Sequence, residues 1–350
     1  FMQQALEYPE KEAVVTSPRR ISYGQLHLEA SALAEQLLSL EIRPNQHVAI
    51  LLDKCWEQIV AVMAIGYSGG TYLPIDPNIP LARRDYLLEK ADVKIVITSK
   101  ARKVEMPEYL PTISLTAAAT DATPNRSLLL PFDIKARPEQ LIYTLFTSGS
   151  TGHPKGVMIS HAAVLNTVMD VNRRLQVTAT DRILGVSALN FDLSVFDIFA
   201  PLVVGGTIIL PNEEDRQDAK ILLSWVAREE VTLWNTVPAL VGMLCTEIEQ
   251  EKTCIPKSLR YIMMSGDKIP VSVCERVQAL PSSCKIMGLG GPTECSIWSV
   301  YFPVAELDFS SDHLPYGFPL ANQSLQILND RKEQCPEGVL GEIYIGGKGL

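Results

Sequence analysis

The sequence predicts an α/β fold, in which helices alternate with strands along most of the chain. Apolar runs of a strand's length are separated by segments whose apolar residues recur every three or four positions. A run of Gly, Ser and Thr directly follows one such strand-like run, and this is where α/β sheets bind ligands. With 350 residues, 47% of them hydrophobic, the chain is long enough for about two or three subdomains with large cores.

In the first hundred residues a helix-and-strand unit occurs twice. The elements expected there are an amphipathic helix at 22–40 opened by a serine cap, a buried strand at 47–52, a helix at 57–68, an extended segment at 71–75 and a strand at 93–98. Residues 101–138 are rich in Pro, Thr, Ala and Asp and have no sustained period. We therefore expect a connection there.

A second α/β run follows this connection. Its expected strands lie at 140–146, 183–186, 207–210, 231–234, 261–264 and 285–288. From about residue 300 the pattern changes to short β-like pieces, the last at 341–350. We expect a first α/β subdomain at 1–138, a second at 139–300, and the start of a β-rich subdomain at 301–350. Because the sequence begins in a helical pattern and stops in a strand pattern, we expect it to be part of a longer chain.

The run of Gly, Ser and Thr at 147–152 has the residue types that hold phosphate. Its glycines let backbone N–H groups turn toward an anion, its hydroxyls add donors, and Lys155 adds a positive charge. The spacing disfavours a P-loop NTPase, since Gly149 and Gly152 are three apart and Gly156 follows the lysine. The alternative is a flexible surface loop without a ligand.

Asp192 lies in an apolar stretch between Leu189 and Phe196. A carboxylate in such surroundings requires a partner. Two interpretations remain open from the residues alone: a counter-ion for a substrate ammonium group, or a cap for a helix that begins near Ser194.

Two further strand ends carry polar or glycine-rich loops. The loop at 290–294 ends in Thr293 and Glu294, a hydroxyl and a carboxylate suited to nucleotide oxygens and Mg²⁺, although an exposed turn would look the same. The loop at 265–267 allows a backbone to approach a base or ribose, and its alternative is an ordinary turn. The segment 69–77, punctuated by Gly and Pro, is interpreted as structural.

The bulk properties exclude several classes of protein. A formal charge of −9 without any long basic run argues against a nucleic-acid partner. No apolar stretch approaches about 18 residues and no leader pattern is present, so a cytoplasmic protein without a membrane partner is expected. Seven scattered cysteines, without a Cys-x-x-Cys pair, argue against a disulfide framework.

Taken in order, these segments resemble motifs of the adenylate-forming superfamily, and most closely the amino-acid adenylation domain of nonribosomal peptide synthetases. The segments that carry the resemblance are 21–26, 69–77, 145–157, 191–194, 291–294 and 341–345. The likeness extends from end to end. It implies the large N-terminal core of such a domain, with two layered α/β subdomains and a small β-rich one, and without the small C-terminal domain.

The resemblance implies a two-step reaction. An amino-acid carboxylate attacks the α-phosphate of ATP, giving an aminoacyl adenylate and pyrophosphate, and the acyl group then passes to a phosphopantetheine thiol. The implied cofactors are ATP, Mg²⁺ and phosphopantetheine. The implied partners are a peptidyl carrier protein domain and a neighbouring condensation or cyclisation domain. Such chemistry asks the protein for positioning and charge stabilisation.

The resemblance also assigns roles to residues. Thr147, Lys155, Thr293 and Glu294 form the implied catalytic set: Thr293 touches the α-phosphate and Glu294 binds Mg²⁺. Asp192 pairs with the α-ammonium group. The implied nucleotide site consists of Thr147, Ser148, Gly149, Ser150, Thr151, Gly152, Lys155, Gly266, Asp267, Gly290, Gly291, Pro292 and Thr293.

Two departures from the family pattern are visible. The family usually has an aromatic residue against the adenine where this chain has Gly290, so adenine packing is expected from elsewhere. The chain also stops before the family's catalytic lysine domain, so these 350 residues alone are expected to adenylate weakly.

By the same resemblance, nine positions line the amino-acid pocket: Asp192, Leu193, Phe196, Asn235, Met263, Ser265, Leu289, Ile297 and Trp298. This mostly apolar set is similar to the one found for cysteine in siderophore and thiazoline-forming synthetases. Serine, alanine and valine remain open, because such a pocket rejects near isosteres by only about 1–3 kcal/mol. The alternative functions are a free-standing acyl- or aryl-CoA ligase and an inactive binding module that keeps the fold.

Overall fold

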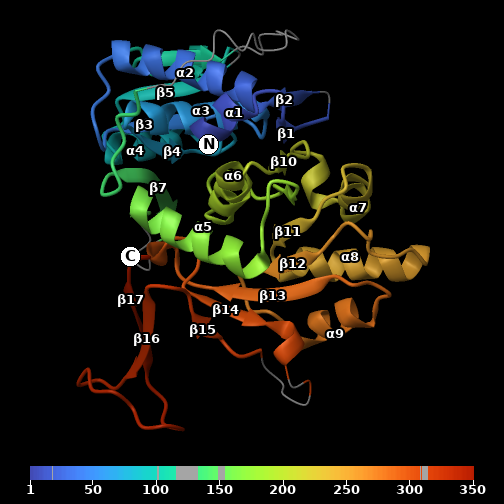
Figure 1. Cartoon of the computed structure of the whole chain (residues 1–350). Helices are drawn as coiled ribbons and strands as arrows, with labels where there is room; N and C mark the ends of the chain where they lie inside the picture. The colour runs from blue at the N-terminus through green and yellow to red at the C-terminus, as the bar shows by residue number, and fades with distance from the viewer. Residues whose placement is uncertain (18, 101, 116–132, 149–153, 308, 310–313) are drawn as a thin grey trace.

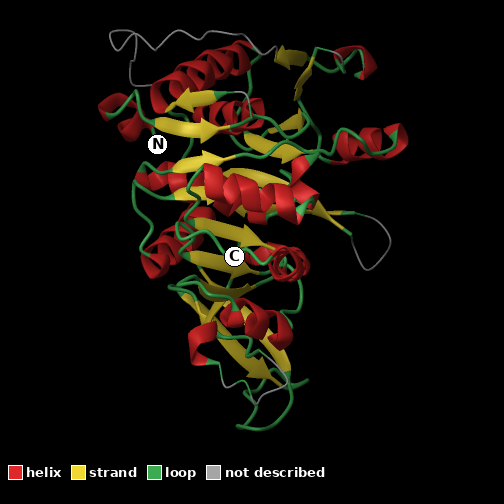
Figure 2. Cartoon of the chain, turned by 90° about the vertical axis from the view of Figure 1, so that its right-hand side faces the viewer, coloured by secondary structure: helices red, strands yellow, loops and turns green. Residues whose placement is uncertain are grey.

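The computed structural model describes residues 1–17, 19–100, 102–115, 133–148, 154–307, 309 and 314–350. It contains two large sheets with helices packed against them and a two-stranded hairpin at the end of the chain (Figures 1 and 2). Among the described residues, no helix combines the length and the hydrophobicity needed to cross a bilayer.

The six-stranded sheet has the order β6-β5-β3-β4-β7-β8 and is parallel except for the β7–β8 pair. Its strands are β3 (His47–Leu51), β4 (Thr71–Pro74), β5 (Ile95–Ser99), β6 (Thr112–Leu115), β7 (Leu141–Thr147) and β8 (Lys155–Ser160). Helices α2 (Tyr23–Ser39), α3 (Trp56–Ser68) and α4 (Leu81–Lys90) accompany them. The expected serine cap is present, since the Ser22 hydroxyl accepts the Gln25 N–H.

The nine-stranded sheet has the order β15-β14-β13-β12-β11-β9-β10-β1-β2. Its strands are β1 (Glu12–Val15), β2 (Arg20–Ser22), β9 (Arg182–Leu184), β10 (Thr207–Ile209), β11 (Leu233–Thr236), β12 (Tyr261–Met264), β13 (Lys285–Gly290), β14 (Val300–Pro303) and β15 (Phe318–Pro319). The remaining α-helices are α1 (Met2–Glu7), α5 (His161–Leu175), α6 (Leu193–Val204), α7 (Ala219–Arg228), α8 (Pro238–Glu251) and α9 (Val271–Ala279). The last two strands, β16 (Gln323–Leu328) and β17 (Glu342–Gly347), form the hairpin, whose residues are mostly exposed or half-buried.

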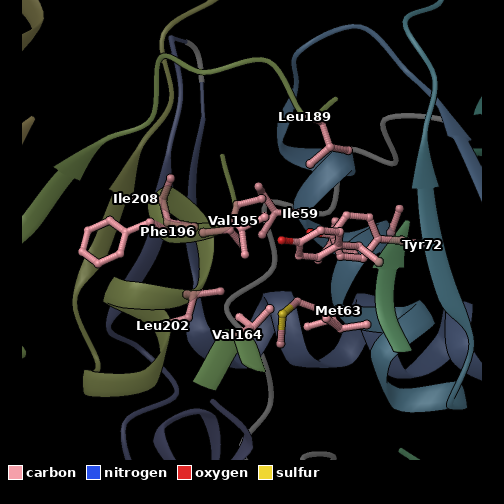
Figure 3. Packing of buried hydrophobic residues seen from close by; sticks show 14 of the residues in the cluster. Ile59, Met63, Tyr72, Val164, Leu189, Val195, Phe196, Leu202 and Ile208 are labelled. Carbon is pink, nitrogen blue, oxygen red and sulfur yellow. The ribbon is translucent and has the colours of Figure 1, made fainter. Parts of the chain in front are cut away.

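Helices α5 and α6 lie between the two sheets (Figure 1). Their apolar residues join those of α3, β4 and β10 in one continuous core, in which Met63, Val164 and Phe196 take part (Figure 3). A second core fills the opposite face of the nine-stranded sheet, under α7, α8 and α9. The two sheets therefore share a helical layer, so the elements of both hold one another in place.

The alternating fold expected from the sequence is confirmed, but some strands were missed. The expected connection at 101–138 contains β6, which extends the parallel sheet beside β5. Strand β8, with buried Val157 and Ile159 alternating with exposed neighbours, was not predicted. The sheets also exchange strands across the division expected near residue 138, because β1 pairs with β10 and β7 pairs with β4.

A buried hydrogen bond links the start of α2 to the nine-stranded sheet. The Tyr23 hydroxyl donates to the Gly206 carbonyl oxygen at 2.7 Å, just before β10. We expect Tyr23→Phe to lower the free energy of unfolding by about 1 kcal/mol, because it removes the donor from a buried carbonyl. Urea denaturation measures this, with Tyr8→Phe as the matched control at a side chain that is 56% exposed. Equal stability of the two variants would contradict the assignment.

Candidate functional site

The candidate site lies at the carboxyl ends of three neighbouring parallel strands, β11, β12 and β13. Asn235 on β11 is in register with Met263 on β12, which is in register with Met287 on β13. Because parallel strands end at the same edge of a sheet, the loops that follow them meet there. The expected loops at 265–267 and 290–294 are two of these.

The phosphate-loop candidate connects β7 and β8 at one edge of the six-stranded sheet. Strands β7 and β8 pair antiparallel, and Thr147 lies opposite Lys155 in the last residue pair before the loop. Strand β8 also contacts the short 3₁₀ turn η4 (Thr293–Cys295), so the hairpin lies beside the loop that follows β13. Ser148 is exposed, and four candidates, Gly149, Ser150, Thr151 and Gly152, lie outside the described residues.

A cleft of about 640 Å³ opens over the ends of β12 and β13. Five of the residues expected at the nucleotide line it: Gly266, Asp267, Gly290, Gly291 and Pro292. Gly266 has φ of +81°, a left-handed conformation that favours glycine. Backbone packing excludes a side chain at Gly291, since a Cβ there would lie 2.6 Å from the Ser299 nitrogen. At Gly266 and Gly291 the two loops therefore expose their backbone to the cleft without an intervening side chain.

Tyr316, which the sequence analysis missed, supplies an aromatic ring to this cleft. A Cβ at Gly290 would lie 2.9 Å from the Tyr316 ring, so the ring occupies the space that a side chain at 290 would need. Tyr316 is 47% exposed and lines the cleft. The ring is far along the chain from the glycine, and the only sequence signal is the turn-forming Pro315 and Gly317 around it.

Asp192 and Thr293 connect this cleft to the second half of the site. The Thr293 hydroxyl donates to the Asp192 carboxylate at 2.9 Å, although 101 residues separate them. Asp192 is only 6% exposed, and no cation pairs with it among the described residues. Burial raises the pKa of the Asp192 carboxyl, and the nearby Glu294 charge raises it further, while the Thr293 hydrogen bond opposes both. Its side chain makes no capping hydrogen bond to α6, so capping does not account for its burial.

The other candidate pocket residues are all buried. Six of them belong to the shared core: Leu193, Phe196, Met263, Leu289, Ile297 and Trp298. The Phe196 and Trp298 rings lie 5.1 Å apart. Asn235 bonds to the backbone of α6 through the Leu193 carbonyl oxygen, at 3.2 Å, and Ser265 follows two residues after Met263. The structure thus gathers these side chains between the start of α6 and one face of β11–β13.

The carboxylate expected to bind metal stands alone. Glu294 is exposed, and the described residues contain no group of three or more His, Cys, Asp or Glu side chains placed to hold a metal. This fits Mg²⁺, which keeps its waters and is commonly held by one or two carboxylates together with substrate phosphates. Glu294 follows directly on residues 291–293, two residues after the last residue of that loop to line the cleft, and its role in binding Mg²⁺ stays a prediction.

Two charged residues that the sequence analysis did not single out lie behind the pocket. Asp197 is 2% exposed and accepts a hydrogen bond from Asn235 at 2.9 Å. Lys54 donates to the Ser187 carbonyl oxygen at 2.7 Å, and its charge acts on Asp197. The sequence signal for Asp197 is a second acidic residue within an apolar run.

The sequence and the fold of this chain are both similar to those of known proteins. The model of the AMP-binding enzyme family matches residues 1–350. The chain is 36% identical, over its whole length, to an anguibactin system regulator of Vibrio anguillarum and to the pyochelin synthetase PchF of Pseudomonas aeruginosa. It spans 33% of the first relative and 19% of the second.

Solved structures of the nonribosomal peptide synthetase FmoA3 superimpose on almost the whole chain. The form bound to AMPPNP gives a TM-score of 0.90 at 34% identity, covering 99% of this chain and 36% of that one. The form bound to alpha-methyl-L-serine-AMP gives 0.89 at 35% identity, covering 99% and 38%. The fold and the family resemblance expected from the sequence are therefore confirmed.

Proposed function

The chain belongs to the AMP-binding enzyme family, and from that premise we propose that it activates an amino acid as its aminoacyl adenylate, releasing pyrophosphate from ATP. The observation that carries the proposal is the 2.9 Å hydrogen bond between Thr293 and Asp192. It brings Asp192, the proposed anchor for a substrate ammonium group, next to Thr293, the proposed contact of the α-phosphate. A substrate held at both points has its carboxylate directed at phosphorus.

In the proposed reaction a carboxylate oxygen forms a bond to the α-phosphorus while the bond to the β-phosphate oxygen breaks. The substrate supplies the nucleophile, so the protein's contribution is orientation and charge compensation. Asp192 holds the ammonium group, which takes over the charge compensation of the carboxylate and frees the Thr293 hydroxyl to donate to the α-phosphate. Thr147 and Lys155, the residues that flank the phosphate loop, hold the leaving phosphates. Mg²⁺ bound by Glu294 would offset the phosphate charge.

We further propose cysteine as the amino acid. The side chains assigned to the pocket are mostly apolar, and among the described residues they include no basic partner for an acidic side chain and no acidic group other than Asp192 and the neighbouring Asp197. Its polar points, Asn235 and Ser265, suit a weakly polar tip. The ligand bound to one similar structure, alpha-methyl-L-serine-AMP, also has a small polar side chain. Serine, alanine and valine are the competitors.

The acceptor of the activated acyl group is proposed to be a phosphopantetheine thiol on a peptidyl carrier domain, next to a condensation or cyclisation domain. The support is the similarity to longer proteins, among them a pyochelin synthetase of which this chain spans 19%. A free-standing acyl- or aryl-CoA ligase is the second candidate. It fits less well, because a substrate without an ammonium group leaves the buried Asp192 carboxylate uncompensated.

Asp192→Asn tests the amino-acid anchor in the native-length protein. We expect kcat/KM for the amino acid in ATP–pyrophosphate exchange to fall about 100-fold or more, because the buried charge partner of the ammonium group is lost. Binding of AMPPNP should stay unchanged. Full exchange activity in the variant would mean that the substrate is a plain carboxylic acid, and no exchange in the parent would favour an inactive binding module.

Tyr316→Ala tests the assignment of the cleft to the base. Removing the ring should raise the KM for ATP about 10-fold, given that base–aromatic stacking contributes about 1–3 kcal/mol, and leave the KM for the amino acid unchanged. Tyr109→Ala is the control, since Tyr109 is 79% exposed and does not line the cleft. A rise in the amino-acid KM instead would place the base elsewhere.

A panel of aminoacyl-sulfamoyl adenosines tests which amino acid the protein prefers. The measurement is the thermal stabilisation of these 350 residues by each compound. A ligand that binds only the native state raises its stability by mass action. We expect the cysteinyl compound to raise the Tm more than the seryl, alanyl and valyl compounds do. A larger Tm shift with one of the other compounds would support the proposed activity but contradict cysteine as the substrate.

A further inference from the structure

The orientation of one pocket side chain is determined by its surroundings. Asn235 is fully buried, and its amide nitrogen donates to the Leu193 carbonyl oxygen at 3.2 Å and to the Asp197 carboxylate at 2.9 Å. Both partners are acceptors, so the nitrogen and not the oxygen of the amide must face them. The Asn235 Oδ1 atom is thereby turned away from both, and no donor among the described residues reaches it.

Strand geometry tells on which side this oxygen lies. Successive side chains of a strand alternate between the two faces of the sheet. Trp234 belongs to the core under α7–α9, so Asn235 faces α6, on the same face as its register partner Met263. The free oxygen therefore belongs to the amino-acid pocket. The Ser265 hydroxyl, two residues after Met263, is also buried, and no described residue forms a hydrogen bond with it.

Asp197 stands behind Asn235, one helical turn after Leu193. Burial raises the pKa of the Asp197 carboxyl to about 7, and the Asn235 hydrogen bond and the positive charge of Lys54 keep it from rising further, so the carboxyl is mostly ionised above that pH. Asp197 and Lys54 both line a cavity of about 10 Å³, roughly the size needed for one water molecule. An ionised carboxylate accepts hydrogen bonds and cannot donate them, so it holds the amide in one orientation.

We propose that Asp197, supported by Lys54, is a positioning residue that presents the Asn235 amide oxygen to the pocket as an acceptor, and that this acceptor selects amino acids whose side chain donates a hydrogen bond. The inference rests on the proposed function and deepens it. A buried acceptor left without a donor carries a desolvation cost, which a thiol or hydroxyl removes and a methyl group does not. The side chains of cysteine and serine can donate a hydrogen bond to the Asn235 oxygen, whereas those of alanine, valine and 2-aminobutyrate cannot.

L-2-Aminobutyrate is the decisive comparison, because it replaces the thiol of cysteine with a methyl group. In ATP–pyrophosphate exchange by the native-length protein, we expect kcat/KM to favour cysteine over L-2-aminobutyrate about 10-fold or more. In Asp197→Asn the new amide can donate to the Asn235 oxygen, which frees the Asn235 amide to reorient. The preference should then narrow to about 3-fold or less while the KM for ATP stays unchanged.

The matched control is Asp181→Asn. Asp181 is also a buried carboxylate, paired with Arg260 at 2.8 Å, but it lies at the amino end of β9, at the opposite edge of the sheet from the pocket. The control should keep the parent's preference whatever it does to stability. A purely structural role for Asp197 would lower the activity toward both amino acids equally and leave their ratio unchanged.

Equal use of cysteine and L-2-aminobutyrate by the parent, or an unchanged ratio in Asp197→Asn, would overturn the inference while the proposed function stands. If no amino acid supported exchange, both the inference and the proposed function would be contradicted. Should Asp197→Asn fail to fold, Lys54→Met takes its place, since loss of the lysine charge favours the protonated carboxyl. A preserved ratio in that variant likewise overturns the inference, and a narrowed ratio supports it.

Discussion

The in-register parallel pairing of β11, β12 and β13 is the constraint on which the site depends. Because the three strands end together, the loop after β12, the loop after β13 and the pocket side chains of β11 meet at one edge. The core shared with the six-stranded sheet then holds α6 over the same edge, and the β7–β8 hairpin reaches it from the other sheet. Side chains from many separate segments thus converge through strand pairing and core packing.

Asp192 and Asp197 are two buried carboxylates on one short stretch of chain, and their different surroundings suit them to different roles. Asp192 accepts a hydrogen bond from a hydroxyl and pairs with no cation among the described residues, which supports its proposed role as the anchor of an ammonium group. Asp197 has an amide donor and lies within the field of Lys54, so its charge is already engaged. One therefore suits recognition of an ammonium group, and the other suits orientation of a neighbour.

Much of the candidate site could be predicted from the sequence, because its parts leave local patterns. These patterns are the periodicity of the strands, the glycine-rich loops and an aspartate within an apolar stretch. What escaped prediction depends on contacts between distant segments. The role of the Tyr316 ring in the cleft follows from its contact with Gly290, which the sequence does not reveal. The role of Lys54 likewise follows from its charge acting on Asp197, 143 positions away. Strand β8 was missed because a Gly-rich segment precedes it and only two of its residues are buried.

The hairpin of β16 and β17 has a consequence for the cleft. Ile343 and Ile345 both lie on β17 and form part of the cleft wall, whereas the floor comes from the loops after β12 and β13. Two isoleucine side chains offer neither a hydrogen-bond donor nor an acceptor. The polar side chains that line the cleft are Asp267, Lys268 and Tyr316, so β17 contributes shape and apolar surface to the cleft and no hydrogen-bonding side chain.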